Sequence, residues 1–202
     1  MKYAPVMNRF FGLVFVSAAL CVFQPVPWAA AAGAVVNLPG NSLYRSPLRL
    51  QDQQGRQFDL ASMRGRPIIV SMFYASCTAA CPLTIDTIEE TRRAVDPSGR
   101  AAPSVLMISF DPQHDDVFNL AAMAKAHRLD PERWRLTRPT AGDIDAFAAT
   151  LGVAYRRRAS DFSHNAVIAL LDENGRLIAR TSLVGRLDAA FVKAVREHTV
   201  GR

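Results

Sequence analysis

The amino-acid sequence predicts an α/β domain in which helices flank a central mixed sheet, with a β-hairpin at the N-terminal end. Short apolar runs rich in β-branched residues alternate with segments of helical periodicity, as is typical of strands joined by helices. At both ends of the domain, two short strand-like segments flank a group of turn residues, which indicates a hairpin. The chain has 202 residues, half of them hydrophobic, so it can bury one substantial core.

The folded region is expected to begin with the N-terminal hairpin. Residues 48–51 and 57–60 alternate apolar and polar side chains around a turn that contains Gly55. The preceding residues 33–46 show no sustained periodicity, and we predict that they form a flexible tether. The domain itself is therefore expected over residues 47–202.

A nearly continuous apolar run over residues 67–74 is predicted to be the central strand, buried on both faces. A helical pattern follows over residues 83–95, so the residues between form a strand-to-helix turn. The same alternation continues to the end of the chain, where a second hairpin and a last helix follow. The further strands are predicted at 105–110, 134–136, 166–171 and 176–182, and the further helices at 117–127, 144–151 and 187–198.

Residues 1–32 have the composition of an export leader. Basic Lys2 and Arg9 precede or border an apolar run over residues 10–23, and small alanines follow at 29–32. The apolar run is shorter than the ~20 residues of a usual membrane-spanning helix. We expect a signal peptide or, alternatively, an N-terminal membrane anchor. Either one places the domain in the periplasm, or anchored to the inner membrane and facing the periplasm.

The charge pattern does not indicate a nucleic-acid partner. The formal net charge of +6 falls to +4 when Lys2 and Arg9 are removed with the leader. The only run of three consecutive basic residues is Arg156, Arg157 and Arg158, which we interpret as a solvated strand edge or loop. A nucleic-acid-binding surface usually shows a concentrated basic stripe instead.

The domain keeps two cysteines, Cys77 and Cys81, at the turn after the central strand. They are too close in sequence to join distant segments, so local chemistry is expected of them. Pro82 suits the first position of a helix. Cys81 would then immediately precede the helix, where the positive end of the helix dipole favours its thiolate. This spacing permits either a redox dithiol or a shared soft metal ion.

Three segments together resemble the Sco/SenC family of copper chaperones, which have a thioredoxin-like fold. Residues 73–82 match an F-x-x-x-C-x-x-x-C-P pattern, and residues 109–115 match S-x-D-P-x-x-D. Asp161-Phe162-Ser163-His164, before the next strand, resembles the family's histidine segment. The resemblance covers about residues 48–200.

The resemblance implies that Cys77, Cys81 and His164 bind one copper ion, and that Asp111 supports the site without binding the metal. Two thiolates and one imidazole independently suit Cu(I), and the same donors can accept Cu(II). His114 departs from the usual family pattern and lies beside Asp115. We expect it to be a solvated loop residue, with metal contact as the less favoured alternative.

The expected function is that of an exported metallochaperone rather than an enzyme. The family likeness makes the copper centre of cytochrome c oxidase the expected recipient, and a cuproenzyme or oxidase subunit and other periplasmic copper carriers the expected partners. A thiol-disulfide oxidoreductase that reduces a partner's cysteines is an alternative that needs only the two cysteines. A peroxiredoxin-like peroxidase is a third, because Thr78 and Cys81 match a T-x-x-C pattern.

Overall fold

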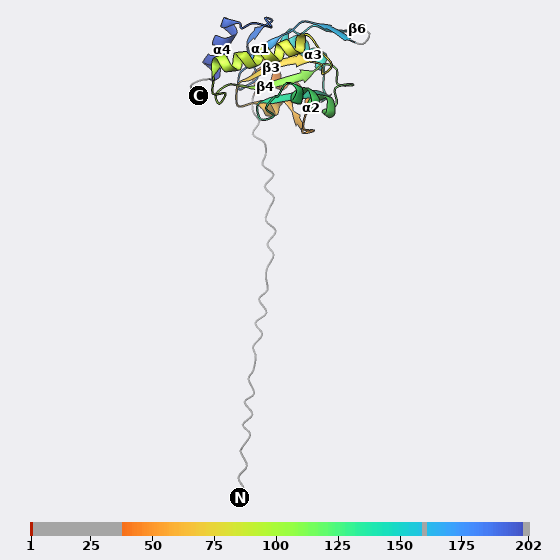
Figure 1. The fold of residues 1–202 in the computed structure, drawn as a ribbon, viewed down its shortest axis with the longest axis vertical. Coiled ribbons are helices and arrows are strands. Elements are labelled where there is room, and N and C mark those ends of the chain that lie inside the picture. The colour runs from red at the N-terminus through yellow and green to blue at the C-terminus, as the bar shows by residue number, and fades with distance from the viewer. Residues whose placement is uncertain (2–37, 159–160, 200–202) are drawn as a thin grey trace. The chain divides into compact units, whose positions relative to one another are not determined.

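The computed structural model describes Met1 and residues 38–158 and 161–199. Apart from Met1, the predicted leader lies outside the described residues, and the prediction about its cleavage or anchoring stays a prediction. Within the part that the structure describes, no helix is both long and apolar enough to cross a bilayer. Figure 1 shows the described domain as a layered assembly of helices and strands.

The centre of the domain is a seven-stranded sheet in the order β2-β1-β5-β4-β3-β8-β9. β3 is parallel to β4 and β4 to β5, whereas β8 runs antiparallel to β3. The sheet is therefore mixed, as predicted. Its strands are β1 Arg49–Asp52, β2 Gln57–Asp59, β3 Ile68–Phe73, β4 Ser104–Ser109, β5 Trp134–Ala141, β8 Ile168–Leu171 and β9 Leu177–Thr181.

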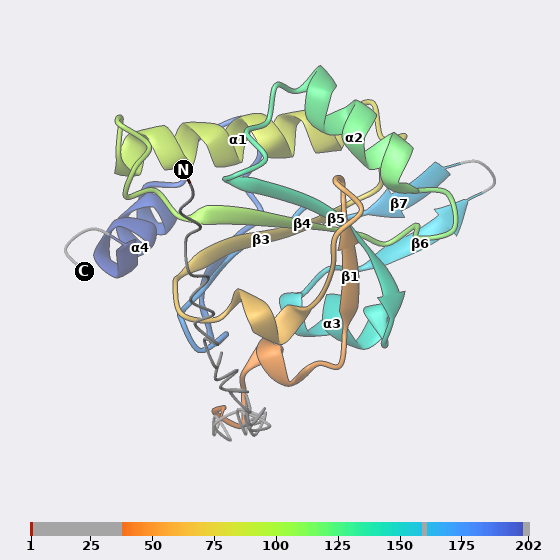
Figure 2. The ribbon, with the colours of Figure 1, turned by 90° about the horizontal axis from the view of Figure 1, so that it is seen from below.

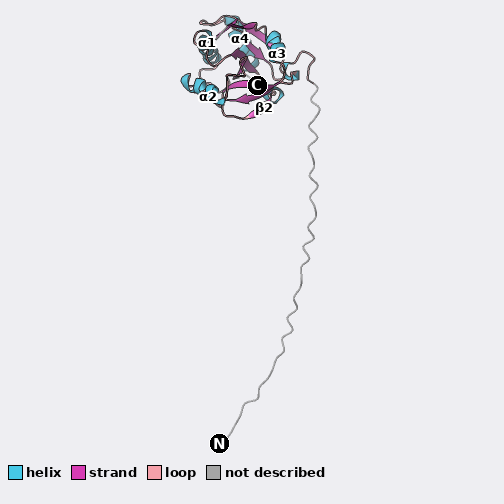
Figure 3. Cartoon of the chain, turned by 90° about the vertical axis from the view of Figure 1, so that its right-hand side faces the viewer, coloured by secondary structure: helices cyan, strands magenta, loops and turns pink. Residues whose placement is uncertain are grey.

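The helices cover the sheet on both sides (Figures 2 and 3). In Figure 2, α1 and α3 lie on opposite sides of the sheet, and α1 packs against α4. Seen from another side, the strands lie among the helices. The helices are α1 Ala80–Val95, α2 Val117–Ala126, α3 Ile144–Leu151 and α4 Ala189–Thr199.

Local sequence explains where the elements begin and end. Every residue of β3 is buried, which agrees with its continuous apolar sequence and central place in the sheet. The Asp116 side chain caps α2 by accepting from the Asn119 N–H, and Asp143 caps α3 in the same way. α3 ends at Gly152, whose φ of 82° is left-handed and favours glycine.

The fold begins earlier than predicted, so the expected tether over residues 33–46 is too long at its C-terminal end. Leu43 and Tyr44 are buried, and the Leu43 N–H donates to the Gly175 carbonyl at 2.8 Å. A Cβ at Gly175 would lie 2.5 Å from the Tyr44 ring, which excludes any larger residue there. The segment that contains Leu43 and Tyr44 therefore packs against the hairpin turn at Gly175 and belongs to the folded domain. Sequence periodicity did not predict this.

A second, two-stranded sheet was not predicted as such. β6 Tyr155–Arg158 and β7 Asp161–His164 pair antiparallel, with Tyr155 opposite His164. The three arginines interpreted as a strand edge or loop belong to β6, and His164 is the last residue of β7. This β6–β7 hairpin is separate from the main sheet.

Candidate metal centre

The cysteine loop, residues 74–79, lies between the end of β3 and the start of α1. The Cys77 N–H donates to the Tyr74 carbonyl at 3.2 Å, which closes a turn directly after the strand. The Cys81 N–H donates to Cys77 Sγ at 3.3 Å. Two sulfur atoms are thus brought together by the strand-to-helix connection, as the sequence predicted.

The helix start corrects one detail of that prediction. α1 begins at Ala80, so Cys81 lies in the first helical turn instead of preceding the helix, and Pro82 is its third residue. Proline is tolerated there because the first N–H groups of a helix have no intrahelical acceptor. It is therefore the Cys77 sulfur, outside the helix, that receives a helix N–H.

The two thiols differ in pKa. The sequence predicted a favoured thiolate at Cys81, but in this arrangement the lower pKa belongs to Cys77. The pKa of Cys77 is lowered, chiefly because Cys81 donates a hydrogen bond to it, with His164 as a further donor. The pKa of Cys81 is raised by its bond to Cys77 and by burial. These opposite shifts favour the thiolate at Cys77 and the protonated thiol at Cys81 before a metal binds.

His164 completes a cluster of three soft donors. One ligand atom from each of Cys77, Cys81 and His164 lies within 4.8 Å of the other two. Among the described residues, this is the cluster of histidine, cysteine and acidic groups that could hold a metal ion. The hydrogen bond with Cys77 raises the pKa of His164. The structure thus brings together the three residues that the resemblance implied.

Aromatic rings of the main domain contact the imidazole at the end of the β6–β7 hairpin. The His164 ring lies 5.2 Å from the Phe110 ring and 5.9 Å, edge-on, from the Tyr74 ring. Phe110 also stacks on Tyr155 at 4.6 Å and meets Phe162 at 5.0 Å. Because Tyr74 and Phe110 directly follow β3 and β4, the main sheet positions the hairpin through ring contacts.

Polar contacts fix the same hairpin at further points. The Tyr74 hydroxyl donates to the Asp161 carboxylate, and Arg157 donates to Asp111. The Arg157 guanidinium also lies over the Phe162 ring, 4.5 Å from its centre. Asp111 is thus connected to the strand that pairs with β7, and its expected supporting role would act through Arg157.

Asp115 is a buried residue of the site region that sequence reasoning did not single out. Its carboxylate accepts the Ala75 N–H at 3.0 Å and the Ser109 hydroxyl. Burial raises its pKa above the ordinary value. Asp115 therefore joins the loop after β4 to the cysteine loop. Its place in the matched 109–115 motif was the available signal.

The cysteine loop borders two open hollows. One, of about 460 Å³, is lined by Cys77 and His164 together with Tyr74 and Phe162. The other, of about 400 Å³, is lined by Cys77, His114 and residues of α2. Cys77 is 9% exposed and lines both hollows, whereas Cys81 is 2% exposed and is not among their lining residues, so Cys77 is the more accessible of the two buried sulfurs.

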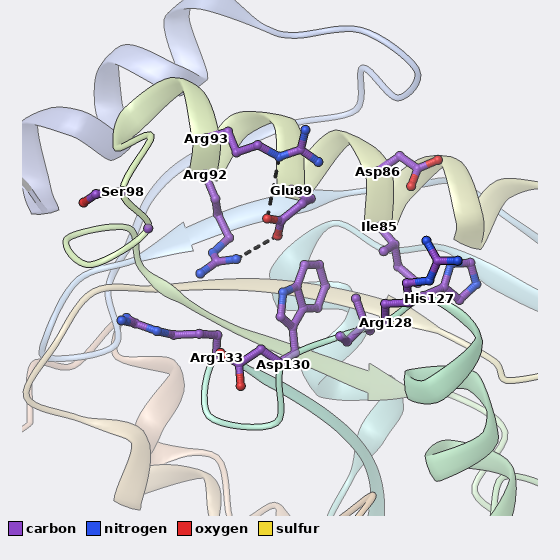
Figure 4. A pocket seen from close by; sticks show the side chains of 13 residues that line it. Ile85, Asp86, Glu89, Arg92, Arg93, Ser98, His127, Arg128, Asp130 and Arg133 are labelled. Atoms are coloured by element: carbon purple, nitrogen blue, oxygen red, sulfur yellow. Dashed lines mark hydrogen bonds and ion pairs between the residues drawn. The ribbon is translucent and has the colours of Figure 1, made fainter.

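A third hollow, of about 520 Å³, lies along α1 away from the cysteines (Figure 4). Three of the charged groups that line it pair with one another, since Glu89 contacts Arg92 at 2.7 Å and Arg93 at 3.8 Å. Arg92 also donates to the Pro103 carbonyl. These contacts connect α1 to the loop that follows it. We therefore place the candidate site at the cysteine loop and not in this hollow.

Comparison with protein-family models matches residues 37–197 to the model described as SCO1/SenC. None of the curated proteins matches the chain. The family match spans the sheet, the helices and the three donor residues, and thus most of the chain.

Solved structures give the same fold. The structure of Bradyrhizobium japonicum ScoI with copper bound has a TM-score of 0.58 and 24% identity, covering 75% of this chain and 97% of that one. A SCO1/SenC family lipoprotein from Bacillus anthracis str. Ames has a TM-score of 0.66 and 17% identity, covering 74% and 91%.

A third structure is that of BsSco, described as a member of the Sco family of cytochrome c oxidase assembly proteins with a disulfide switch. Its TM-score is 0.67 and its identity 16%, covering 81% of this chain and 97% of that one. At such identities, the likeness establishes the fold. The predicted thioredoxin-like α/β fold is confirmed.

Proposed function

The chain belongs to the SCO1/SenC family, and from this premise we propose that it is a copper chaperone whose cargo binds to Cys77, Cys81 and His164. The observation that carries the proposal is the convergence of two sulfur atoms and one imidazole nitrogen within 4.8 Å. Copper binding by the Bradyrhizobium relative supports the same cargo here.

The donor set favours copper over the other common metals. Thiolate and imidazole ligands in a low-coordinate arrangement suit Cu(I), and they can also accept Cu(II). Structural zinc would require a fourth protein ligand, whereas catalytic zinc keeps an open position for water. The three-donor cluster has no fourth histidine, cysteine or acidic member among the described residues. Because the ligands bind as thiolates, copper would displace the proton of Cys81.

Delivery requires a site that a partner can reach. The hollow of about 460 Å³ opens beside Cys77 and His164, so an incoming ligand could replace the imidazole while both sulfurs hold the ion. We propose a cuproenzyme as the recipient, and within that class the copper centre of cytochrome c oxidase. The description of BsSco as an oxidase assembly protein supports this choice.

The leader predicted over residues 1–32 supports a place in the periplasm, or on the inner membrane facing it. The lipoprotein relative agrees with an exported or membrane-attached protein. In either place the chain would meet other periplasmic copper carriers. A dithiol outside the cytoplasm must be kept reduced to bind copper.

The lowered pKa of Cys77 and the raised pKa of Cys81 favour thiol-disulfide exchange as a second candidate function. The Cys77 thiolate would attack a partner disulfide, forming a mixed disulfide and releasing one partner thiolate. Deprotonated Cys81 would then attack Cys77, releasing the second partner thiolate and leaving Cys77 and Cys81 oxidised. The raised pKa of Cys81 disfavours the peroxidase alternative, in which Cys81 itself would need to be the thiolate.

A competition titration tests the copper proposal. The reduced domain is titrated with Cu(I) in the presence of bicinchoninate, as wild type, His164→Ala and His198→Ala. His198 is the matched control because it lies in α4, with its Nδ1 on the Ala194 carbonyl. We expect one tightly bound ion in the wild type and in His198→Ala, and weaker binding in His164→Ala.

Two outcomes would overturn the three-ligand site. One is a wild type that does not compete with bicinchoninate, and the other is an affinity for Cu(I) and Cu(II) that His164→Ala leaves unchanged. Reduction of a mixed disulfide by the metal-free protein measures the second candidate function separately. That activity should survive in His164→Ala, because the exchange chemistry needs only the two sulfurs.

A further inference from the structure

Another hollow beside the cysteine loop is lined by two further histidines, His114 and His127. It has a volume of about 400 Å³ and borders Cys77, the more exposed of the two buried sulfurs. Its other polar and sulfur-bearing walls come from the loop before α2 and from α2 itself. These lining residues are His114, Asp115, Asn119, Met123 and His127.

The Asp111 carboxylate orients the His114 imidazole. Its Nδ1 lies 2.9 and 3.0 Å from the two carboxylate oxygens of Asp111. In the neutral tautomer that donates from Nδ1 to this carboxylate, Nε2 would carry the lone pair. A carboxylate on the far nitrogen is the usual way in which proteins orient a histidine ligand and increase its basicity. The side chain of His114 is 65% exposed, so an incoming ion can reach it.

The backbone around His114 is fixed to the cysteine loop. The Asn119 side-chain amide donates to the His114 carbonyl at 2.8 Å, and the His114 N–H donates to the Asp111 carbonyl at 3.1 Å. The next residue, Asp115, accepts the Ala75 N–H two positions before Cys77. His114 and Cys77 therefore line one hollow, and their segments are joined by connected hydrogen bonds.

We infer that His114 is a transfer ligand that binds copper transiently on its way to and from Cys77. This inference rests on the proposed copper function. His114 lies outside the three-donor cluster, so it takes no part in the final site. Its chemistry suits an ion that arrives with thioether, imidazole or chelator ligands and exchanges them one at a time.

The transfer is a ligand exchange without electron transfer. A bond forms between copper and His114 Nε2 while one bond to the incoming carrier breaks. Cys77 Sγ then binds the ion and the last carrier bond breaks. Cys81 loses its proton to solvent and binds next, and His164 replaces His114. Release follows the same steps in reverse.

A ligand of this kind has a distinctive kinetic signature. Because His114 stabilises the exchange transition state and not the final complex, its removal slows loading and release by the same factor. The dissociation constant, which is the ratio of the two rates, stays unchanged. A residue that only supported His164 through Asp111 and Arg157 would instead accelerate release and weaken binding.

Stopped-flow exchange with bicinchoninate measures both directions, using Cu(I)-bicinchoninate as donor and free bicinchoninate as acceptor. The variants are His114→Ala, His114→Asn and, as the distant control, His198→Ala. Asparagine can keep a hydrogen bond to Asp111 through its amide nitrogen but offers no imidazole nitrogen to copper. We expect both rates to fall about tenfold in the two His114 variants, equivalent to about 1.4 kcal/mol of barrier.

Each remaining outcome contradicts the inference. Wild-type rates in His114→Ala would exclude a transfer role. Recovery of the rates in His114→Asn would show that the hydrogen bond to Asp111, and not the imidazole, is what matters. A changed dissociation constant would place His114 in the final site or in its support. A wild type that binds no copper would refute the proposed function itself.

Discussion

The two sides of the metal centre are built in different ways. The cysteine loop follows β3, in which every residue is buried, and leads directly into α1, so the main core positions both sulfurs. The β6–β7 hairpin forms its own two-stranded sheet, and β6 is mostly exposed. His164 is therefore positioned by ring contacts and by polar pairs that link the hairpin to the main domain.

This difference teaches that the sulfur donors and the imidazole donor respond to different perturbations. Moving the sulfurs requires disturbing the end of a central strand, whereas moving the imidazole requires only the loss of side-chain contacts on the hairpin. A chaperone benefits from such a division. The sulfurs can retain the ion while the imidazole is exchanged for a ligand of the recipient.

The largest expected effect is on the sulfur side. Cys81→Ser removes a ligand held by the first turn of α1, so the Cu(I) affinity should fall by more than the ~100-fold that losing an outer support typically costs. Serine fits the space of the thiol, and far-ultraviolet circular dichroism should stay that of the wild type. If Cys81→Ser lowers the Cu(I) affinity by a smaller factor than His164→Ala does, the sulfurs are not the main ligands.

The next effect is on the hairpin side. Phe162→Ala removes the ring that packs on Phe110 and Tyr74, so His164 should lose its orientation and Cu(I) affinity should fall about 10–100-fold. The free energy of unfolding should fall by less than the about 3–5 kcal/mol expected for Phe73→Ala in the core. Urea unfolding and bicinchoninate competition on both variants measure this contrast. Equal destabilisation by the two changes would show that the hairpin belongs to the main folding unit.

A smaller effect concerns the pH dependence of the metal-free dithiol. The lowered pKa of Cys77 keeps it a thiolate as the pH falls below the ordinary thiol pKa of about 8.5, whereas an ordinary thiol loses about tenfold in thiolate for each pH unit. Iodoacetamide should therefore alkylate Cys77 at nearly constant rate between about pH 8 and pH 6.

His164→Ala raises the Cys77 pKa, because it removes one of the hydrogen bonds that stabilise the thiolate. The alkylation rate should fall in the acidic part of the range, by no more than about tenfold, since the larger contribution of Cys81 remains. Mass spectrometry of the alkylated peptide identifies the residue. Preferential alkylation of Cys81 would reverse the assignment.

The smallest effect is expected at the exposed end of the hairpin. Arg157 is half-exposed in its pair with Asp111, and such pairs contribute about 0–1 kcal/mol. Arg157→Ala should therefore change Cu(I) affinity only a few-fold. Arg157→Lys, which keeps the charge but not the planar contact with Phe162, should lie between that variant and the wild type. A loss as large as that of Phe162→Ala would make the ion pair the main anchor.

The sequence predicted the elements with strong periodicity and missed those that depend on tertiary contacts. The apolar run of β3 and the cysteines after it could be placed from local pattern alone. The β6–β7 hairpin could not, because consecutive arginines lack the alternation typical of a half-buried strand. Its stability comes from rings contributed by other elements, above all Phe110.

The candidate site shows the same limit in its details. His164 was indicated by family resemblance, since no local rule predicts that an exposed strand will reach the cysteine loop. The thiolate was assigned to Cys81 because Pro82 was placed at the first helical position. The helix begins two residues before Pro82, and the sulfur outside it gains the hydrogen bonds. The role of Asp115 could not be predicted from the sequence, because its carboxylate accepts a backbone N–H from a distant segment, that of Ala75.

The most direct test of the account is copper K-edge X-ray absorption on the Cu(I)-loaded protein. The fine structure reports which atoms bind the metal, independently of affinity. We predict two sulfur ligands and one imidazole nitrogen in the wild type, loss of the nitrogen in His164→Ala, and an unchanged spectrum in His114→Asn. A wild-type spectrum without an imidazole nitrogen, or one that His164→Ala leaves unchanged, would contradict the three-ligand centre.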